Sequence, residues 1–249
     1  MMLFVVVPFY NEKTLLPNTL DALAAQSDAD FTLVLVDNAS SDTSRDLAQE
    51  FASQHPCMRI EIINEQCKGT GVASDTGFRH AIARGSTHIA RTDADCLPAR
   101  DWVRNIKRAF CEHGLEFVAG SIKPRTDDIR LSRWDRVLIP TVLWLAVKTG
   151  RLRRRGRQFK YPYILAAGNN LAITAELYQR AGGFPRTSIE HEHEDRVLSE
   201  RVRTLTTRGS VRSDVLVYNS TRRVKRYGYA RTIGWYVAHW GRLPEVDVR

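Results

Sequence analysis

Four short apolar runs, separated by stretches with helical periodicity, fill the first 95 residues and constrain the fold more than any other feature. The runs are β-branched and bounded by polar residues, and they lie at residues 3–8, 31–37, 59–63 and 87–93. Between them, apolar side chains recur at helical spacing within residues 16–24, 47–51 and 78–82. This alternation predicts an α/β fold, in which right-handed crossovers join mostly parallel strands and helices cover both faces of the sheet.

The second half of the chain is less regular. Helical periodicity returns at residues 103–110 and 197–205, and short strands are expected at residues 117–120 and 215–218. Residues 123–162 predict a helix rich in Trp and Leu, followed by a mobile basic loop, RLRRRGRQFK, at 151–160. Because the sequence has no internal repeat and no linker, we expect one domain.

Composition excludes several classes of protein. With 43% hydrophobic and 26% charged residues, the chain is an ordinary globular protein rather than a disordered, collagen-like or disulfide-rich one. Its four cysteines form no CxxC pair and have no histidine at zinc-finger spacing, so reduced thiols in the cytosol are expected. The net charge of +9 favours an anionic partner, which leaves nucleic acid, a lipid surface and a phosphorylated substrate open.

Two apolar segments need separate consideration. Leu3–Phe9 has no basic segment before it and contains Pro8, so it predicts a buried strand rather than a secretion leader. Val137–Val147 has about half of the ~20 residues that a membrane-spanning helix needs and contains Pro140. No transmembrane segment is expected.

The loops that follow three of the expected strands are rich in polar side chains. They are PFYNE at 8–12, DNASSD at 37–42 and DAD at 93–95. In open α/β sheets ligands bind beyond the carboxyl ends of the strands, so these carboxylates are expected to converge at one edge. Mg²⁺ takes one or two carboxylates plus substrate phosphates, so Asp93 and Asp95 predict a metal that neutralises a leaving diphosphate. A DxD that occurs by chance in a loop is the alternative.

Six segments, in chain order, resemble the inverting nucleotide-sugar glycosyltransferases of family 2, which have the GT-A fold. They are VVVPFYNE at 5–12, LVLVDNASSDTS at 33–44, GTGVASDTGFRHA at 69–81, RTDAD at 91–95, GNNLAITAELYQRAGGF at 168–184 and HEDRVLSERV at 193–202. The resemblance implies a single GT-A type domain over residues 1–249. Residues 1–95 would form its nucleotide-binding half and 96–220 its acceptor-binding half, with a basic aromatic tail at 221–249.

The resemblance also implies roles for single residues. The donor-binding candidates are Pro8, Tyr10, Glu12, Asp37, Lys68, Asp93 and Asn169, and the candidate ligand of Mg²⁺ or Mn²⁺ is Asp95. Pro8, Tyr10 and Glu12 would line the nucleoside pocket. Asp37 would contact the base, and Asp93 would lie near the ribose. Asn169 and its neighbour Asn170 would hydrogen-bond donor hydroxyls, and turn formation explains the two asparagines almost as well. Simple packing is the alternative for Tyr10. A helix cap is the alternative for Asp37, and Asp42 competes for that cap.

The glycine-rich segment departs from the family pattern. Family members commonly carry an Arg-Asn pair where this chain has Ser74 and Asp75. A carboxylate that faces a diphosphate is unfavourable unless a metal or a cation offsets it, and Lys68 and Arg91 are the candidate cations. Either these residues reshape the donor pocket, or Asp75 turns away from it. Arg91 is itself unusual, because that strand position is normally apolar.

Glu194 and Asp195 match the ED motif of the family, in which the aspartate is the general base. Inversion in one displacement needs a carboxylate beside the acceptor hydroxyl, on the face of the sugar opposite the departing nucleotide. The alternative is an acidic first helical turn, which the helix dipole favours in any case. His191 and His193 are candidates for completing a metal site or tuning the base, with exposed loop histidines as the alternative.

These features predict transfer of a sugar from a nucleoside diphosphate sugar, with UDP favoured by family frequency, to an alcohol acceptor. A sugar nucleotidyltransferase is the alternative within the same class of fold. It is expected to carry a Lys- and Arg-bearing glycine loop after the first strand, where this chain has PFYNEKTLLP. A dinucleotide-dependent oxidoreductase needs GxGxxG after a strand, and the segment from Gly69 to Gly71 lacks the third glycine. A basic nucleic-acid-binding protein is the alternative from another class. No binding-module signature supports it, so no nucleic acid partner is expected.

The acceptor and the location are linked questions. Val137–Val147 is followed by cations at 151–160, and further cations lie at 222–226. This pattern predicts a cytoplasmic enzyme attached to the anionic inner face of a membrane, with a lipid-linked acceptor. An ordinary core helix with solvated arginines is an equal alternative, and a soluble phosphorylated acceptor would attract the same cations.

Overall fold

The computed structural model describes residues 1–125, 158–161, 164, 166–186, 194–220 and 222. The strands in this part of the chain are β1 (Leu3–Phe9), β2 (Thr32–Asp37), β3 (Arg59–Asn64), β4 (His88–Thr92), β5 (Cys96–Pro98), β6 (Phe117–Pro124), β7 (Asn170–Thr174) and β8 (Gly209–Asn219). The helices are α1 (Leu16–Ala24), α2 (Ser44–Gln54), α3 (Thr70–Ala83), α4 (Trp102–Cys111), α6 (Ala175–Arg180) and α7 (Glu194–Leu205).

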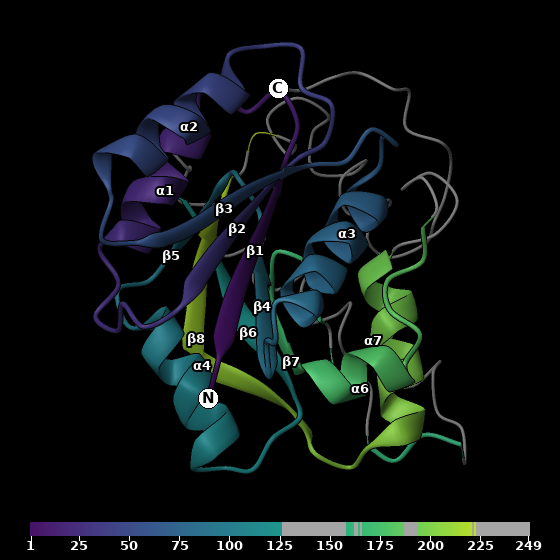
Figure 1. Cartoon of the computed structure of the whole chain (residues 1–249). Coiled ribbons are helices and arrows are strands. Elements are labelled where there is room, and N and C mark those ends of the chain that lie inside the picture. Colours follow the sequence, from purple (N-terminus) through teal and green to yellow (C-terminus); the bar gives the residue numbers. More distant parts are fainter. Residues whose placement is uncertain (126–157, 162–163, 165, 187–193, 221, 223–249) are drawn as a thin grey trace.

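The described strands form one eight-stranded sheet in the order β3-β2-β1-β4-β7-β6-β8-β5 (Figure 1). Strands β1 to β4 pair in parallel, as their helical crossovers require. Strand β7 then pairs antiparallel with both β4 and β6, while β8 joins β6 in parallel and β5 antiparallel. The expected α/β class is confirmed, and β7 marks the junction between the two parts of the sheet.

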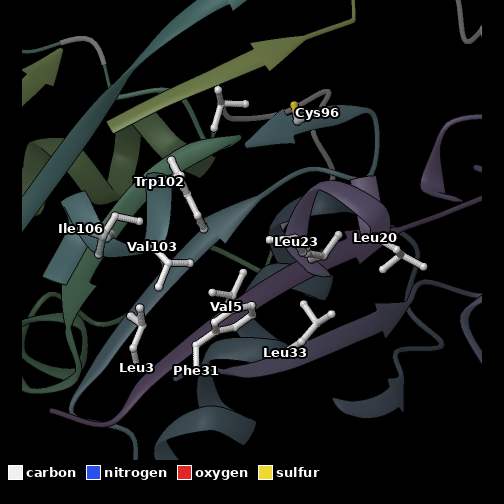
Figure 2. Packing of buried hydrophobic residues seen from close by; sticks show 14 of the residues in the cluster. Leu3, Val5, Leu20, Leu23, Phe31, Leu33, Cys96, Trp102, Val103 and Ile106 are labelled. Carbon is white, nitrogen blue, oxygen red and sulfur yellow. The ribbon is translucent and has the colours of Figure 1, made fainter. Parts of the chain in front are cut away.

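Helices bury both faces of this sheet. Leu3 and Val5 of β1 pack with Leu20 and Leu23 of α1 in a core that also includes side chains of α2 and α4 (Figure 2). The alternate residues of β1 point to the opposite face, where they join a second core formed with α3, α6 and α7. An unbroken apolar run is therefore what this central strand requires.

Helix α3 lies unusually close to the sheet at Gly77. A Cβ at this position would overlap Cγ1 of Val6 on β1 and would lie 2.8 Å from Cγ2 of Val36 on β2. Only glycine allows the helix backbone to approach the two strands this closely. The close approach fixes how α3 lies across the strands whose carboxyl ends carry the predicted site.

The expected strands of the first half are all confirmed, and the second half holds the differences. Strands β5 and β7 were not anticipated, and β8 begins at Gly209 rather than at residue 215. Most of the segment 123–162, including most of the helix and basic loop expected there, lies outside the described residues, as does most of the tail. Among the helices that the structure describes, none is long and apolar enough to cross a membrane.

Candidate active site

The carboxyl ends of β1, β2 and β4 meet at one edge of the sheet because the three strands are parallel. Hydrogen bonds tie the loops after β1 and β2 together. The Glu12 N–H donates to Ser44 Oγ at 2.7 Å, and the Ser41 N–H donates to Asn11 Oδ1 at 2.8 Å. Asn11 adopts a left-handed φ of 52°, which turns the chain at the end of β1.

The predicted nucleoside pocket is built around the end of β1. Pro8 is buried within the strand, opposite Val36 of β2. Tyr10 contacts Lys68, whose ammonium donates to the Tyr10 hydroxyl at 3.0 Å and lies 4.7 Å from the ring centroid. Two of the donor-binding candidates, far apart in the sequence, are therefore brought into contact.

Asp37 ends β2 as a buried carboxylate and accepts a hydrogen bond from the Ser40 N–H at 3.0 Å. The hydrogen bond at the start of α2 comes from another residue, because Asp42 accepts from the Ser44 N–H at 2.9 Å. Asp42, and not Asp37, therefore accepts a backbone N–H at the start of α2, where the N-cap residue is Thr43 and its side chain makes no cap hydrogen bond. Asp37 remains at the strand end, where the predicted base contact requires it.

Arg222 links Glu12 with Asp95. Its Nη1 donates to Glu12 Oε2 at 2.9 Å, and its Nη2 lies 3.0 Å from Asp95 Oδ2 and also contacts the second Glu12 oxygen. In the sequence, Arg222 stands among the cations of the tail. A spacing pattern gives no sign that a residue so late in the chain reaches the ends of β1 and β4.

Arg91 joins Asp93, a predicted donor-binding residue, to the ED motif. Its guanidinium is buried and lies 3.1 Å from Asp93 Oδ1 and 3.3 Å from Glu194 Oε1, and its Cζ is 5.5 Å from the centroid of the Phe184 ring. Burial acts to lower the pKa of Arg91, but the charges of Asp93 and Glu194 outweigh burial and raise that pKa. Arg91 is therefore a permanent cation between two carboxylates.

Asp195 lies in the first turn of α7 and is held by backbone donors. Its Oδ2 accepts from the Gly168 N–H at 3.0 Å, and its Oδ1 accepts from the Arg196 N–H at 2.7 Å. Removal of the carboxylate from water raises its pKa above that of an ordinary aspartate, although these hydrogen bonds and Arg91 oppose the shift. A raised pKa makes Asp195 a stronger proton acceptor than a solvated carboxylate.

The two adjacent asparagines have different environments. Asn170 accepts from the Trp102 indole at 2.9 Å and donates to the carbonyls of Ser121 and Val215, so it serves packing and not a ligand. The side-chain oxygen of Asn169, in contrast, is buried without a hydrogen-bond partner. Asn169 therefore keeps the capacity to bind a donor hydroxyl, and Asn170 does not.

Asp75 is bound to side chains of α3, of α6 and of the segment that follows α6. It is fully buried, accepts from the Tyr178 hydroxyl at 2.8 Å, and pairs with Arg79 at 2.6 Å and Arg186 at 3.1 Å. The cations that pair with Asp75 are thus Arg79 and Arg186, rather than the candidates Lys68 and Arg91. The neighbouring Ser74 hydroxyl donates to the Thr70 carbonyl within α3.

The carboxylates fit a divalent cation only in part. The described residues contain no group of three or more His, Cys, Asp and Glu that would hold a metal alone. Mg²⁺ and Mn²⁺ need just one or two carboxylates when a diphosphate supplies the other oxygens, and Asp95 meets that requirement. Arg222 already neutralises Asp95, so a metal would have to take over that ion pair. His191 and His193 lie outside the described residues.

Comparison with curated proteins finds glycosyltransferases. The chain is 26% identical over 121 residues to glycosyltransferase AglE of Haloferax volcanii, covering 48% of this chain and 38% of that protein. It is 32% identical over 139 residues to the undecaprenyl-phosphate 4-deoxy-4-formamido-L-arabinose transferase of Pseudomonas syringae, covering 54% and 40%. The chain thus spans about two fifths of the length of these relatives.

Solved structures share the fold. S. aureus TarS 1–349 in complex with UDP-GlcNAc superposes with a TM-score of 0.66 at 15% identity, over 89% of this chain and 59% of that one. The mannosyltransferase PcManGT of Pyrobaculum calidifontis, in complex with GDP-Man and Mn²⁺, gives 0.64 at 23% identity, over 97% and 65%. The expected GT-A type fold is confirmed.

The sequence itself matches a family model, described as glycosyl transferase family 2, over residues 4–171. That segment contains β1 to β4, Asp93 and Asp95, and it covers well over half of the chain. This chain belongs to glycosyl transferase family 2.

Proposed function

We propose that this chain transfers a sugar from a nucleoside diphosphate sugar, with a UDP-sugar as the first choice, to an alcohol acceptor with inversion. The observation that carries the proposal is the pair of backbone hydrogen bonds that aim Asp195, from Gly168 and Arg196. These bonds fix a carboxylate of raised pKa, and Arg91 connects its neighbour Glu194 to Asp93 on the proposed donor side. A general base needs this combination of fixed direction and basicity.

In this proposal the donor lies along the ends of β1, β2 and β4. Tyr10 and Lys68 contact the nucleoside side, Asp37 the base, and Asn169 a sugar hydroxyl. When bound, Mg²⁺ or Mn²⁺ at Asp95 supplies positive charge that neutralises the leaving diphosphate. Asp195 takes the proton of the acceptor hydroxyl. At the same time the acceptor oxygen attacks the anomeric carbon of the donor sugar from the face opposite the nucleotide, which leaves as the diphosphate, and the configuration of that carbon is inverted.

The relatives support the classes of substrate. TarS binds UDP-GlcNAc and PcManGT binds GDP-Man with Mn²⁺, so a nucleotide-sugar donor is common to both neighbours. The Pseudomonas relative is named as an undecaprenyl-phosphate transferase, which supports a lipid-linked acceptor. We therefore extend the proposal to a lipid-linked alcohol acceptor, in which a sugar carried on a polyprenyl diphosphate offers the attacking hydroxyl, and to action in the cytoplasm, at the inner face of the membrane.

The test is a panel of UDP-, GDP- and dTDP-sugars with a short-chain polyprenyl diphosphate sugar that offers free hydroxyls, followed by mass spectrometry with Mn²⁺ or with excess EDTA. Asp195→Asn keeps the size of the side chain but accepts no proton. We expect it to bind nucleotide normally and to transfer about 10² to 10⁴ times more slowly. Glu112→Gln, on the exposed end of α4, serves as the control and should transfer at the wild-type rate.

Three outcomes would overturn parts of the proposal. No product with any donor rejects the activity, and full activity in EDTA rejects the metal. An inactive Glu194→Gln beside an active Asp195→Asn moves the base by one residue. Sedimentation with anionic and neutral vesicles tests the membrane separately, because equal and negligible pelleting with both removes the proposed attachment.

A further inference from the structure

Arg91 places a buried positive charge on a central strand of the sheet. This residue belongs to β4, a central strand, where it is paired with Val6 of β1 on one side and Leu171 of β7 on the other. Its side chain is 1% exposed. A buried guanidinium is unfavourable unless carboxylates and hydrogen bonds replace the lost water, so its partners show what it holds in place.

Those partners come from both sides of the candidate active site. The guanidinium contacts Asp93 after its own strand, at 3.1 Å from both Nε and Nη2. It also contacts Glu194 in the first turn of α7, which is 103 residues away in the chain. A planar fork of donors bridges two carboxylates in fixed directions, which a lysine ammonium does not do.

The guanidinium also supports the backbone that holds Asp195. A Cβ at Gly168 would lie 2.9 Å from Cζ of Arg91, so the Gly168 backbone lies close to the guanidinium, and a side chain there would have to displace it. The N–H of the same glycine donates to Asp195 at 3.0 Å. Arg91 thus fixes the base in two ways, through Gly168 and through the neighbouring Glu194.

We propose that Arg91 is the positioning residue for the general base: it holds Gly168 and the start of α7 against the donor-side Asp93, so that Asp195 points at the acceptor oxygen. This inference rests on the function proposed above. It assigns a purpose to a charged residue at a strand position that is normally apolar. Loss of these Arg91 contacts should therefore impair the proton transfer and leave the binding of the nucleotide unchanged.

The first test measures the support directly and needs no substrate. In Arg91→Lys, the Gly168 amide should exchange with solvent at least ten times faster than in the wild type, together with the first turn of α7. Amides of α3 and β2 should exchange at unchanged rates. Unchanged exchange at Gly168 overturns the inference, whether or not any donor is turned over.

The second test separates positioning from stability. With the donor and acceptor found active for the wild type, Arg91→Lys and Gly168→Ala should each lower kcat about 100-fold and leave the KM for donor within a factor of three. Arg79→Met is the matched control, because Arg79 also pairs with a buried carboxylate, Asp75, but supports no catalytic group. It should unfold at lower temperature with an unchanged kcat.

These results also separate the inference from the function on which it rests. If the wild type transfers and Arg91→Lys has the wild-type kcat, Arg91 is structural and the inference fails alone. If the wild type transfers no sugar and Gly168 still loses protection in Arg91→Lys, the proposed function fails and the support of Asp195 by Arg91 stands. A parallel loss of kcat in Arg79→Met would overturn the specific role of Arg91.

Discussion

Asp75 illustrates, at the scale of one residue, how a departure from a family pattern becomes part of the packing. A carboxylate replaces an amide in a helix that borders the donor site, and the structure turns it toward Tyr178 and two arginines. Burial and the Asp75 charge together raise the pKa of Tyr178, so that hydroxyl stays protonated and donates to Asp75. The same hydroxyl accepts from the Phe184 N–H at 3.0 Å, which anchors the segment before the ED motif.

We expect Asp75→Ala to lower the free energy of unfolding by about 2 to 4 kcal/mol, because it orphans the Tyr178 hydroxyl and breaks two ion pairs. Urea denaturation measures this change. Glu176→Ala is the control, since the Glu176 carboxylate is 80% exposed and its pairing with Arg180 should contribute less than about 1 kcal/mol. If Asp75→Ala instead lost nucleotide affinity and kept normal stability, Asp75 would be a residue of the donor pocket.

At the scale of elements, the packing of helix α3 on the sheet depends on Gly77. On helix propensity alone, Gly77→Ala should stabilise the protein by up to about 1 kcal/mol. The new methyl would instead overlap Val6 and press on Val36, so we expect a net destabilisation of about 1 to 3 kcal/mol or more. Thermal unfolding decides the sign, and a higher melting temperature would mean that α3 moves off the sheet at little cost.

Elements whose signal is local could be predicted, and the others could not. Strands β1 to β4 are apolar runs between helical stripes, and sequence periodicity is sufficient to find them. Strand β7 has five residues directly after a Gly-Asn turn, and the first part of β8, GSVRSD, is polar. Such segments become strands only because distant neighbours pair with them, and no local pattern records that pairing.

The site divides in the same way. Asp37, Asp93 and Asp95 could be located because each lies at or just after the end of a predicted strand, and Asp195 because its motif precedes a helical stripe. The partners of these residues could not be located. Arg222 reaches Glu12 from 210 residues away, and the arginines that neutralise Asp75 are identified only by the folded chain. The sequence gives the number of cationic residues but not the carboxylates with which they pair.

For the whole molecule, two groups of carboxylates respond to pH in opposite directions. Loss of water raises the pKa of Asp93 and Asp195, whereas for Glu65 and Glu116 hydrogen bonds and arginines outweigh partial burial and lower the pKa. A raised pKa costs stability as pH rises above about 4, where the unfolded chain ionises. A lowered pKa adds stability above that pH, and this stability is lost as pH falls through the folded value.

We therefore expect the urea midpoint to hold or rise slightly from pH 7 to about pH 5 and to fall steeply below pH 4. Glu65→Gln isolates the second group, because Glu65 accepts from Thr76 and pairs with Arg186 at 2.9 Å. It should cost about 1 kcal/mol at pH 7 and almost nothing at pH 3. An equal cost at both pH values would show that the charge of Glu65 does not contribute.

The position of β7 in the chain also determines when the sheet can be completed during synthesis on the ribosome. Strand β4 is finished at Thr92, yet the strand that covers its second edge ends at Thr174, roughly 80 residues and about 4 to 16 seconds of translation later. For that interval the nascent sheet carries an open edge, the kind of surface on which chains associate wrongly. Arg91 lies on β4, the strand with the open edge. Its charge discourages pairing of this edge with other chains before the ED motif has been synthesised.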